Sequence, residues 1–374
     1  MATEATTSRP HRSSTLRAVV IPEGSSPGLL EVPRKDSGNT GFAAEDQFDV
    51  YSAYKRLLSD ELLPMPVAAI LVLTEVVANS KAATMYELVE GLKDAAAVLK
   101  SKYSNQVGLT AGCDLFIRYV TTARQDFSRD FSHHKAELVR QGKEYAETAQ
   151  SSRDKIAEHA FGFIKEDAIL THSYSRVVMQ ALLKANRRKR ISVYVTEARP
   201  KGLGMKTYNA LTAAGIPCTV ILDSAVAYCM DKVDLVLVGS EAVVESGGLI
   251  NAVGTLSMAI IAKAANKPLY ALAESYKFLR FFPLSQYDLP IDNSSLLTLP
   301  SQKPTAPRHS LTLASPMTPR AVQSQSVPEM SQEQIAKNPE VDYTRPDLIT
   351  LVFSDVGILT PDGISSFLVG VFAD

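Results

Sequence analysis

The spacing of hydrophobic and polar residues changes once along the chain, near residue 165. From Phe48 to about Lys165, apolar residues recur three and four positions apart in segments rich in Ala, Leu and Glu, which is typical of amphipathic helices. We expect helices over 66–80, 84–100, 113–125 and 134–166, the last with an inner stripe of Leu138, Val139, Tyr145, Ala149, Ile156, Ala160 and Phe163. The sequence therefore predicts an all-α helical domain over residues 45–165.

From residue 166 onward, short apolar runs rich in β-branched residues alternate with amphipathic segments. The runs predict strands over 168–172, 191–196, 218–223, 233–239, 268–273 and 348–355. The segments between them predict helices over 175–188, 204–215, 224–231 and 255–266. Continuous apolar strands separated by helices are typical of a parallel sheet that is covered on both faces. The fold class is therefore α/β, with a Rossmann-like doubly wound parallel-sheet domain expected over residues 166–374.

Two segments lack any sustained period. Residues 1–44 are rich in Pro, Gly, Ser and Thr, which favours a flexible N-terminal tail. Ser, Thr and Arg would also suit a transit peptide, but Glu4 and the missing amphipathic repeat favour the tail. Residues 290–340 are rich in Pro and Ser and interrupt the α/β domain. We expect them to form a disordered surface insertion, because so long a loop is unusual inside a domain.

Composition and charge exclude some classes of function. The 374 residues are 45% hydrophobic with a net charge of −1, so no overall field would attract nucleic acid or an anionic membrane. No apolar run is long enough to span a bilayer. Cys113, Cys218 and Cys229 lie in apolar contexts without CxxC spacing, which predicts buried reduced thiols. We therefore expect a cytoplasmic protein of the cytosol, with no direct nucleic-acid partner and no membrane partner.

Polar side chains gather where the predicted strands end. Because the carboxyl ends of parallel strands share one edge of a sheet, these residues predict a ligand pocket, in which arginines hold phosphate and carboxylates bind sugar hydroxyls. Turn and cap chemistry would explain each residue taken singly, but we favour a pocket for the set. The candidate ligand-binding residues are Thr171, His172, Ser173, Tyr174, Ser175, Arg176, Glu197, Arg199, Gly239, Glu241, Gly248 and Asn251.

Catalytic and metal sites find little support in the sequence. His172 and Ser173 are adjacent on an extended segment and would point to opposite sides, so we do not expect a nucleophile–base pair. The hydrolase elbow and the dinucleotide and Walker motifs are missing. His133 and His134 have no acidic or Cys partner at ligand spacing, so no metal is expected. The basic run Arg187–Arg190 lies where a helix should end, and the helix dipole favours cations there.

Five segments together resemble the alpha, beta and delta subunit family of eukaryotic translation initiation factor 2B. They are "ILTHSYSRVV", "SVYVTEARP", "VDLVLVGSEAVVESGGLINAVGT", "NKPLYALAESYKFLRFFPLSQYDLP" and "LITLVFSDVGILTP". The resemblance runs from Tyr51 to Asp374, except over the insertion at 290–340, and "AESYKFLRFFPLSQYDLP" is its most specific part. The pattern is more similar to the alpha branch than to the beta and delta members, which carry long N-terminal extensions.

The same fold family includes aldose–ketose isomerases that act on methylthioribose 1-phosphate and ribose 1,5-bisphosphate. The resemblance implies that these enzymes have Cys, Asp and Lys where this chain has Ser173, Glu241 and Ala252. A serine does not supply the proton transfer of a thiol near neutral pH, and Glu is one methylene longer than Asp. We therefore expect no catalytic residue and no cofactor, while Arg199 and Asn251 would still hold a sugar phosphate or a nucleotide sugar.

The resemblance further implies a regulatory, non-catalytic subunit of the guanine-nucleotide exchange factor complex for translation initiation factor 2. Such a subunit would form a homodimer through its α/β domain and bridge two subcomplexes of beta, gamma, delta and epsilon subunits. Its helical domain would help to bind factor 2 phosphorylated on its own alpha subunit, which lowers exchange under stress. Two alternatives stay open: an active aldose–ketose sugar-phosphate isomerase, and a free-standing metabolite-binding module.

One segment of the α/β domain, "SYKFLRFFPLSQY", is unusually aromatic. An obligate interface needs apolar surface, and this domain is rich in apolar segments. Phe278, Phe281 and Phe282 would pack either at the homodimer interface or in the core, and the sequence favours neither position.

Overall fold

The computed structural model describes residues 48–60, 63–103, 105–123, 130–165, 167–291 and 330–373. The expected tail over 1–44 and residues 292–329 of the expected insertion over 290–340 lie outside these residues. The rest of that insertion is described, and residues 332–336 of it form a short helix. Phe48–Asp374 forms one compact unit that holds both the helices and the sheets. Ile291 and Met330, which flank residues 292–329, line one surface cavity. No helix within the described ranges is long and apolar enough to cross a membrane.

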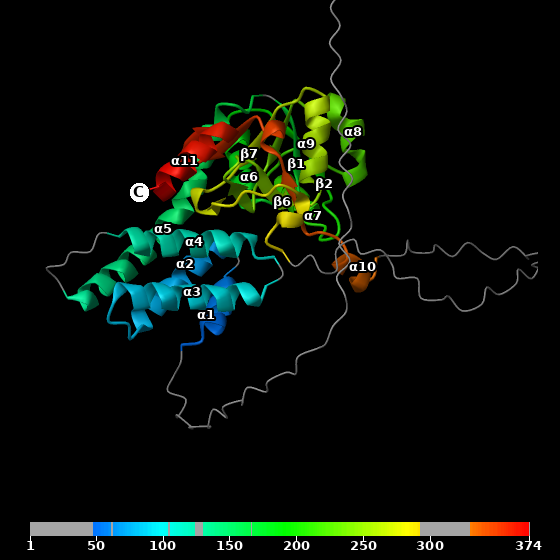
Figure 1. Cartoon of the computed structure of the whole chain (residues 1–374). Coiled ribbons are helices and arrows are strands. Elements are labelled where there is room, and N and C mark those ends of the chain that lie inside the picture. Colours follow the sequence, from blue (N-terminus) through cyan, green and yellow to red (C-terminus); the bar gives the residue numbers. More distant parts are fainter. Residues whose placement is uncertain are drawn as a thin grey trace, which may run out of the picture. The chain divides into compact units, whose positions relative to one another are not determined.

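The N-terminal helices form a bundle, as the spacing predicts (Figure 1). They are α1 (Val50–Leu58), α2 (Met65–Asn79), α3 (Met85–Ser101), α4 (Val107–Thr122) and α5 (Phe131–Phe161). Asp49 starts α1 by accepting hydrogen bonds from the backbone N–H groups of Tyr51 and Ser52. Thr84 and Glu87 form a capping box that starts α3. α2 packs against α1, α3, α4 and α5, so this largely apolar helix is the centre of the bundle.

The inner stripe predicted for α5 is only partly right. Buried residues of this stripe are Leu138, Ala149, Ile156 and Ala160, and Val139 is half-buried. Tyr145 and Phe163 are 39% and 37% exposed. The reason is that α5 changes partners along its length: it packs on α2 and then on the α/β part, so one fixed stripe cannot face both.

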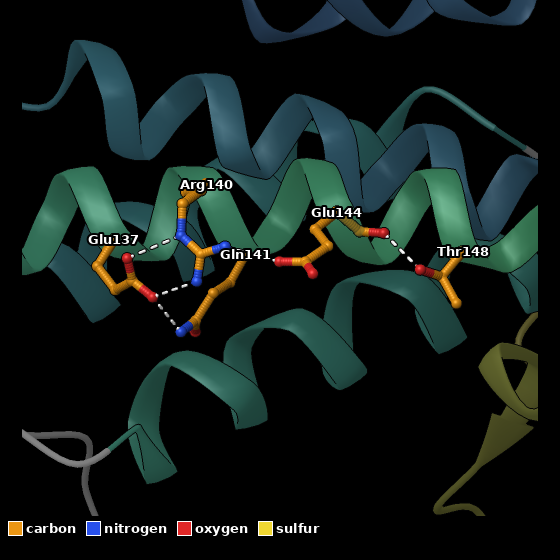
Figure 2. Close-up of polar contacts among 5 residues, drawn as sticks. All are labelled: Glu137, Arg140, Gln141, Glu144 and Thr148. Carbon is orange, nitrogen blue, oxygen red and sulfur yellow. Dashed lines mark hydrogen bonds and ion pairs between the residues drawn. The ribbon is translucent and has the colours of Figure 1, made fainter.

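The solvent-facing side of α5 carries a network of charged side chains (Figure 2). Arg140 donates to Glu137 over 2.7 and 2.9 Å and to Glu144 over 2.8 Å. Its side chain is 60% exposed, and these partners lie three and four residues away on the same helix. Such exposed pairs contribute little stability, so this network keeps one face of α5 in water without holding the fold together.

The main sheet has seven strands among the described residues, in the order β11-β10-β7-β4-β1-β2-β3. They are β1 (Ala168–His172), β2 (Ser192–Thr196), β3 (Cys218–Ile221), β4 (Leu235–Val238), β7 (Leu269–Leu272), β10 (Leu351–Ser354) and β11 (Gly357–Leu359). Every neighbouring pair is parallel except β10 with β11. Strand order reverses direction between β1 and β4, which is the doubly wound arrangement. The predicted fold class, a helical region followed by a parallel-dominated α/β region, is confirmed.

Helices cover both faces of this sheet because successive strand residues point to opposite sides. Ile169 packs with α5, α6 (Arg176–Asn186) and α7 (Gly204–Ala213). Leu170 packs with α8 (Val226–Cys229), α9 (Thr255–Ala264) and α11 (Pro361–Ala373). Shorter helices connect these elements: α10 (Gln332–Ala336), η1 (Asp223–Ala225), η2 (Met230–Lys232), η3 (Ser275–Lys277), η4 (Gln286–Asp288) and η5 (Pro346–Leu348). The continuous apolar strands predicted from the sequence are therefore buried on two sides.

A second, smaller sheet was not predicted. Its order within the described chain is β8-β5-β6-β9, formed by β5 (Ala242–Val244), β6 (Leu249–Ala252), β8 (Phe278–Leu279) and β9 (Val341–Thr344). β5 and β6 make an antiparallel hairpin that packs against Val107 and Ala111 of α4. Phe278 is 3% exposed and lies in the core, Phe281 is half-buried against this sheet, and Phe282 is 60% exposed. Core packing therefore holds for Phe278, and the interface alternative remains for Phe282.

Packing across residue 165 is extensive. α5 packs on α6 and β10, and Tyr276 of η3 inserts among Val67, Ala146 and Ala149 of the bundle. The division into a helical domain over 45–165 and an α/β domain over 166–374 remains a prediction. In the structure these parts share hydrophobic clusters, so side chains of the bundle can form part of a site at the sheet.

Other sequence expectations meet mixed outcomes. Cys113 and Cys229 are buried, but Cys218, on the edge strand β3, is only half-buried. The side chain of Lys189, in the basic run, contacts the end of α5 and not the end of α6, the helix that precedes it. Its ammonium donates to the carbonyls of Phe161 and Ile164 at the end of α5, and it lies 3.9 Å from the Phe161 ring centroid. The run does begin where a helix ends, as expected, since α6 ends at Asn186 with Arg187 as its C-cap, and Lys189 in addition places a cation at the end of α5.

We expect Gly112→Ala to destabilise the bundle. A Cβ at this position on α4 would lie 2.7 Å from Pro66 Cα, so α2 and α4 would have to separate, at a cost of about 1–3 kcal/mol in the free energy of unfolding. Gly91 on α3 meets nothing within 4 Å, so the matched Gly91→Ala should stabilise by up to about 1 kcal/mol. Urea unfolding followed by circular dichroism measures both. A neutral Gly112→Ala would contradict the close approach of these helices.

Candidate functional site

Four neighbouring strands of the main sheet end at one edge and supply the walls of a cavity. His172 ends β1 and Ser173–Val177 follows it, Ala198–Lys201 follows β2, Ser240 and Glu241 follow β4, and Glu274 follows β7. The remaining lining residues are Leu203, Asn251, Ala252, Val253, Lys277 and Glu340. β1 and β4 flank the point where strand order reverses, which is where doubly wound sheets bind ligands. The cavity holds about 190 Å³, which is below the roughly 300–1,000 Å³ of drug-sized sites and suits a small metabolite.

Most of the residues predicted for a pocket do line this cavity. They are His172, Ser173, Tyr174, Ser175, Arg176, Arg199, Glu241 and Asn251. Thr171 lies buried within β1, and Glu197 pairs its backbone with Ile221 and Gly204. The two predicted glycines leave room for neighbouring side chains. A Cβ at Gly239 would collide with Ser175, and one at Gly248 would collide with the Tyr343 ring. These four residues support the walls of the cavity and are not among its lining residues.

His172 is held from both ring nitrogens. Nδ1 lies 2.6 Å from Thr196 Oγ1, and Nε2 lies 2.9 Å from the carbonyl oxygen of Val253. Burial lowers the pKa of His172, although the Val253 carbonyl opposes this shift. Gly254, with φ of 108°, leaves room for the ring, because a Cβ there would lie 2.8 Å from His172 Cε1. A neutral imidazole with both nitrogens engaged is a structural support for the cavity and is not available as a general base.

Two residues of the cavity wall adopt backbone angles that favour glycine. Ser173 has φ of 61° and Ala198 has φ of 59°. The carbonyl of Ser173 accepts a hydrogen bond of 2.6 Å from Thr207 Oγ1 on α7. Non-glycine residues in this region cost free energy and are concentrated at binding and catalytic sites. Strained backbone therefore lies at the cavity after both β1 and β2.

A buried ion cluster forms the back of the cavity. Glu274 is 2% exposed, and its carboxylate lies 3.1 Å from Arg153 Nε of α5 and 2.7 Å from Lys277 Nζ of η3. Burial alone would raise the pKa of Glu274, but Lys277 and Arg153 outweigh burial and lower the pKa to about 2. Burial, followed by repulsion from Arg153, lowers the pKa of Arg176. The helical bundle thus supplies one of the charges that the cavity requires.

A second set of charges lines the mouth of the cavity. Lys201 Nζ pairs with Glu340 at 2.8 Å, and both side chains are about half exposed. Glu241 lies deeper and accepts a hydrogen bond from Asn105. The pKa of Glu241 is raised, mainly by burial and to a smaller extent by the nearby charge of Glu340. The hydrogen bond from Asn105 and the charges of Lys201 and Lys277 act in the opposite direction. Cations and carboxylates therefore alternate around a small polar space, which can hold a molecule that carries both a phosphate and hydroxyl groups.

The small sheet fixes the wall formed by Val253. Asp342 of β9 caps α9 by accepting hydrogen bonds from Gly254 N over 2.7 Å and Leu256 N over 3.0 Å. Burial raises the pKa of Asp342 to about 7, against these two bonds. Asn251 Nδ2 donates to Thr255 Oγ1 over 3.0 Å in the same turn. The start of α9 is therefore held from β6 and β9 together.

Sequence reasoning missed Glu274, Lys277 and Glu340. Glu274 follows β7 directly, so the strand-end argument used for the other residues would have found it. Lys277 arrives through a short helix, and Glu340 from the far end of the expected insertion, so neither has a local signal. No group of three or more His, Cys, Asp or Glu side chains suited to a metal ion occurs in the part of the chain that the structure describes.

The chain is similar to known proteins over most of its length. The profile described as "Initiation factor 2 subunit family" matches residues 63–361. "Translation initiation factor eIF2B subunit alpha" of Dictyostelium discoideum is 36% identical over 89% of this chain and 99% of its own. "Ribose 1,5-bisphosphate isomerase" of Archaeoglobus fulgidus is 29% identical over 60% of this chain and 64% of its own.

Solved structures share the fold. One is described as the "tetrameric eIF2B-beta2-delta2 complex from C. thermophilum". Its matching chain has a TM-score of 0.63 and 20% identity, over 87% of this chain and 93% of that chain. At this identity the likeness shows that the helical bundle and the doubly wound sheet occur together elsewhere in the same order.

We expect Arg153→Leu to be far more damaging than Arg140→Leu. The first leaves the buried Glu274 with one cation and should cost about 3–5 kcal/mol. The second removes an exposed pair (Figure 2) and should cost about 1 kcal/mol or less. Urea unfolding measures both, and equal costs would contradict the importance of the buried cluster.

Because the pKa of Glu274 is lowered to about 2, its stabilisation is present above about pH 4.5 and is lost as pH falls toward 2. This acid loss should shrink in Arg153→Leu.

Proposed function

The chain belongs to the initiation factor 2 subunit family, and on this basis we propose that it is a regulatory, non-catalytic subunit of the guanine-nucleotide exchange factor for translation initiation factor 2. The observation that carries this proposal is the likeness to the eIF2B alpha subunit of D. discoideum over nearly the whole of both chains. The expected partners are the beta, gamma, delta and epsilon subunits, in the cytosol. A beta–delta assembly whose chains share this fold supports an association through the same architecture.

The proposed homodimer needs an apolar surface on the α/β part. Leu222, Tyr228 and Ile260 are 60%, 88% and 51% exposed. They lie on or beside η1, α8 and α9, and α8 contacts the other two elements. Large apolar side chains clustered on contacting elements favour a protein interface. A second copy of the chain is the occupant we propose, and the helical bundle would then stay free to contact factor 2 phosphorylated on its alpha subunit under stress.

The cavity at the strand ends is proposed to hold a sugar phosphate or a related nucleotide sugar as a regulatory ligand. Arg199 and Lys201 would face the phosphate, and Glu241 would accept hydrogen bonds from hydroxyls. Support comes from the alternation of charges in the cavity and from the relatives named as ribose 1,5-bisphosphate isomerases. The same relatives keep the alternative of an active isomerase open. Against it stand Ser173 and Glu241, because neither a serine hydroxyl nor the longer carboxylate suits the proton transfers of that reaction.

A tagged chain recovered from native cytosol should elute in a complex with beta, gamma, delta and epsilon subunits and with factor 2. Native mass spectrometry should show two copies of each subunit. Tyr228→Asp should leave one copy of this chain, whereas Tyr86→Asp, at a residue 76% exposed on the bundle, should not change the dimer. Elution of a homodimer without other subunits would contradict the exchange-factor assignment. Two copies in the Tyr228→Asp complex would contradict the proposed dimer surface.

The purified chain should not turn over ribose 1,5-bisphosphate. The paired variant Ser173→Cys with Glu241→Asp restores the residue types expected in the isomerases, and it should gain a slow rate if the rest of the site is intact. An assay by proton NMR follows the aldose and ketose signals, with Ser246→Cys as a control outside the cavity. Turnover by the unmodified chain would establish the isomerase alternative.

A further inference from the structure

Asn105, in the segment that leads into α4, connects the helical bundle to the cavity. Its Nδ2 donates to Glu241 Oε2 over 2.8 Å, across 136 positions of the sequence. Its Oδ1 accepts from the backbone N–H of Val107, the first residue of α4, over 3.2 Å. The two bonds use opposite ends of one amide, so the donor end is fixed toward Glu241.

Glu241 depends on this donor more than on the nearby cations. Among the described residues, Asn105 alone donates a hydrogen bond to the Glu241 side chain. Lys201 is paired with Glu340 at 2.8 Å, and Lys277 with Glu274 at 2.7 Å. The charged groups that act on Glu241 are these two lysines and Glu340, and after burial the Asn105 bond is the largest influence on its pKa. A buried carboxylate stays charged only where a donor compensates its lost water.

We propose that Asn105 is a positioning residue which stabilises the charged form of Glu241 and directs its carboxylate into the cavity, where the other oxygen accepts hydrogen bonds from ligand hydroxyls. The hydrogen bonds to a ligand rest on the proposed function, whereas the charge and direction of the Glu241 carboxylate do not. A charged carboxylate accepts from hydroxyls and repels phosphate. The position of Glu241 therefore selects a ligand with a polyol end and a separate phosphate, and disfavours a bare phosphate or pyrophosphate.

The same contact makes the bundle part of the site. Asn105 also pairs with Ile291 in an isolated antiparallel bridge, and Gln106 N donates to the carbonyl of Pro290 over 3.3 Å. The start of α4 is thereby tied to the segment that follows β8 and η4. A change in how α4 sits would move the only side-chain donor that Glu241 has within the described residues, so the affinity of the cavity and the position of α4 are linked.

Asn105→Asp separates the two hydrogen bonds of Asn105. Aspartate can still accept from the backbone N–H of Val107, but it cannot donate, and its charge faces Glu241. The folded-state pKa of Glu241, already raised by burial, should rise further, because the donor is lost and a like charge is added beside it. A group with a raised folded pKa loses stability as pH rises through that pKa, so the loss of stability in Asn105→Asp should be larger at about pH 8 than at about pH 5. Asp342 titrates in the same range in every variant and cancels in the difference.

Two further variants complete the stability experiment. Asn105→Asp combined with Glu241→Gln reverses the direction of the hydrogen bond, and it should recover most of the stability at about pH 8. Asn79→Asp is the matched control, because Asn79 is exposed at the end of α2 and donates only to the carbonyl of Glu75. Its effect should be the same at both pH values. Thermal unfolding of the full chain measures all four proteins.

Isothermal titration with ribose 5-phosphate tests the ligand. Asn105→Asp should bind it about tenfold more weakly at about pH 8, while binding of inorganic phosphate should change little. A loss of stability that is equal at both pH values, or a reversed pair without recovery, would overturn the proposal whether or not ribose 5-phosphate binds. A pH-dependent loss in a chain that binds no ribose 5-phosphate would uphold the positioning of Glu241 and reject the proposed ligand pocket.

Discussion

The buried carboxylate of Glu274 is the constraint on which this structure depends. An ionised group at 2% exposure must be compensated, and its two cations come from different places: Arg153 from the middle of α5 and Lys277 from the short helix after β7. Satisfying it fixes α5 across the end of β7 and orients Lys277, whose ammonium also donates to the carbonyl of Ser240 over 2.8 Å. The bundle, the sheet and the floor of the cavity are positioned by one set of charges.

The chemistry of the cavity follows from how fully its groups are already engaged. His172 is neutral and bonded on both nitrogens, Glu274 is paired, and Lys201 is paired with Glu340. Acid–base catalysis needs a group that can take and return a proton within reach of the substrate. A site whose polar groups are committed to one another is better suited to recognising a small polar molecule and transmitting its presence, as a regulatory subunit requires.

Much of the fold could be predicted because fully buried strands leave continuous apolar runs, such as Leu235–Val238 and Leu351–Ser354. The small sheet could not be predicted, because β5, β6 and β8 have only two to four residues each and lie between polar residues, a pattern that is typical of turns. Within the site, most residues that follow a strand were found, with Glu274 after β7 as the exception, and residues that arrive by a longer route were not. Asn105 lies 136 positions from Glu241, and nothing in either local pattern indicates that they meet.

The connection between Ile291 and Met330 has a consequence for how the chain can diversify. Both residues line one cavity, beside the small sheet that holds the wall of the site. When the two ends of a connection are held by the folded part, the entropy of closing it grows only with the logarithm of its length, and doubling the length costs about 0.6 kcal/mol. A flexible stretch added between these two held ends would therefore cost the fold little, and the positions of Glu340 and Asp342 would not depend on its length.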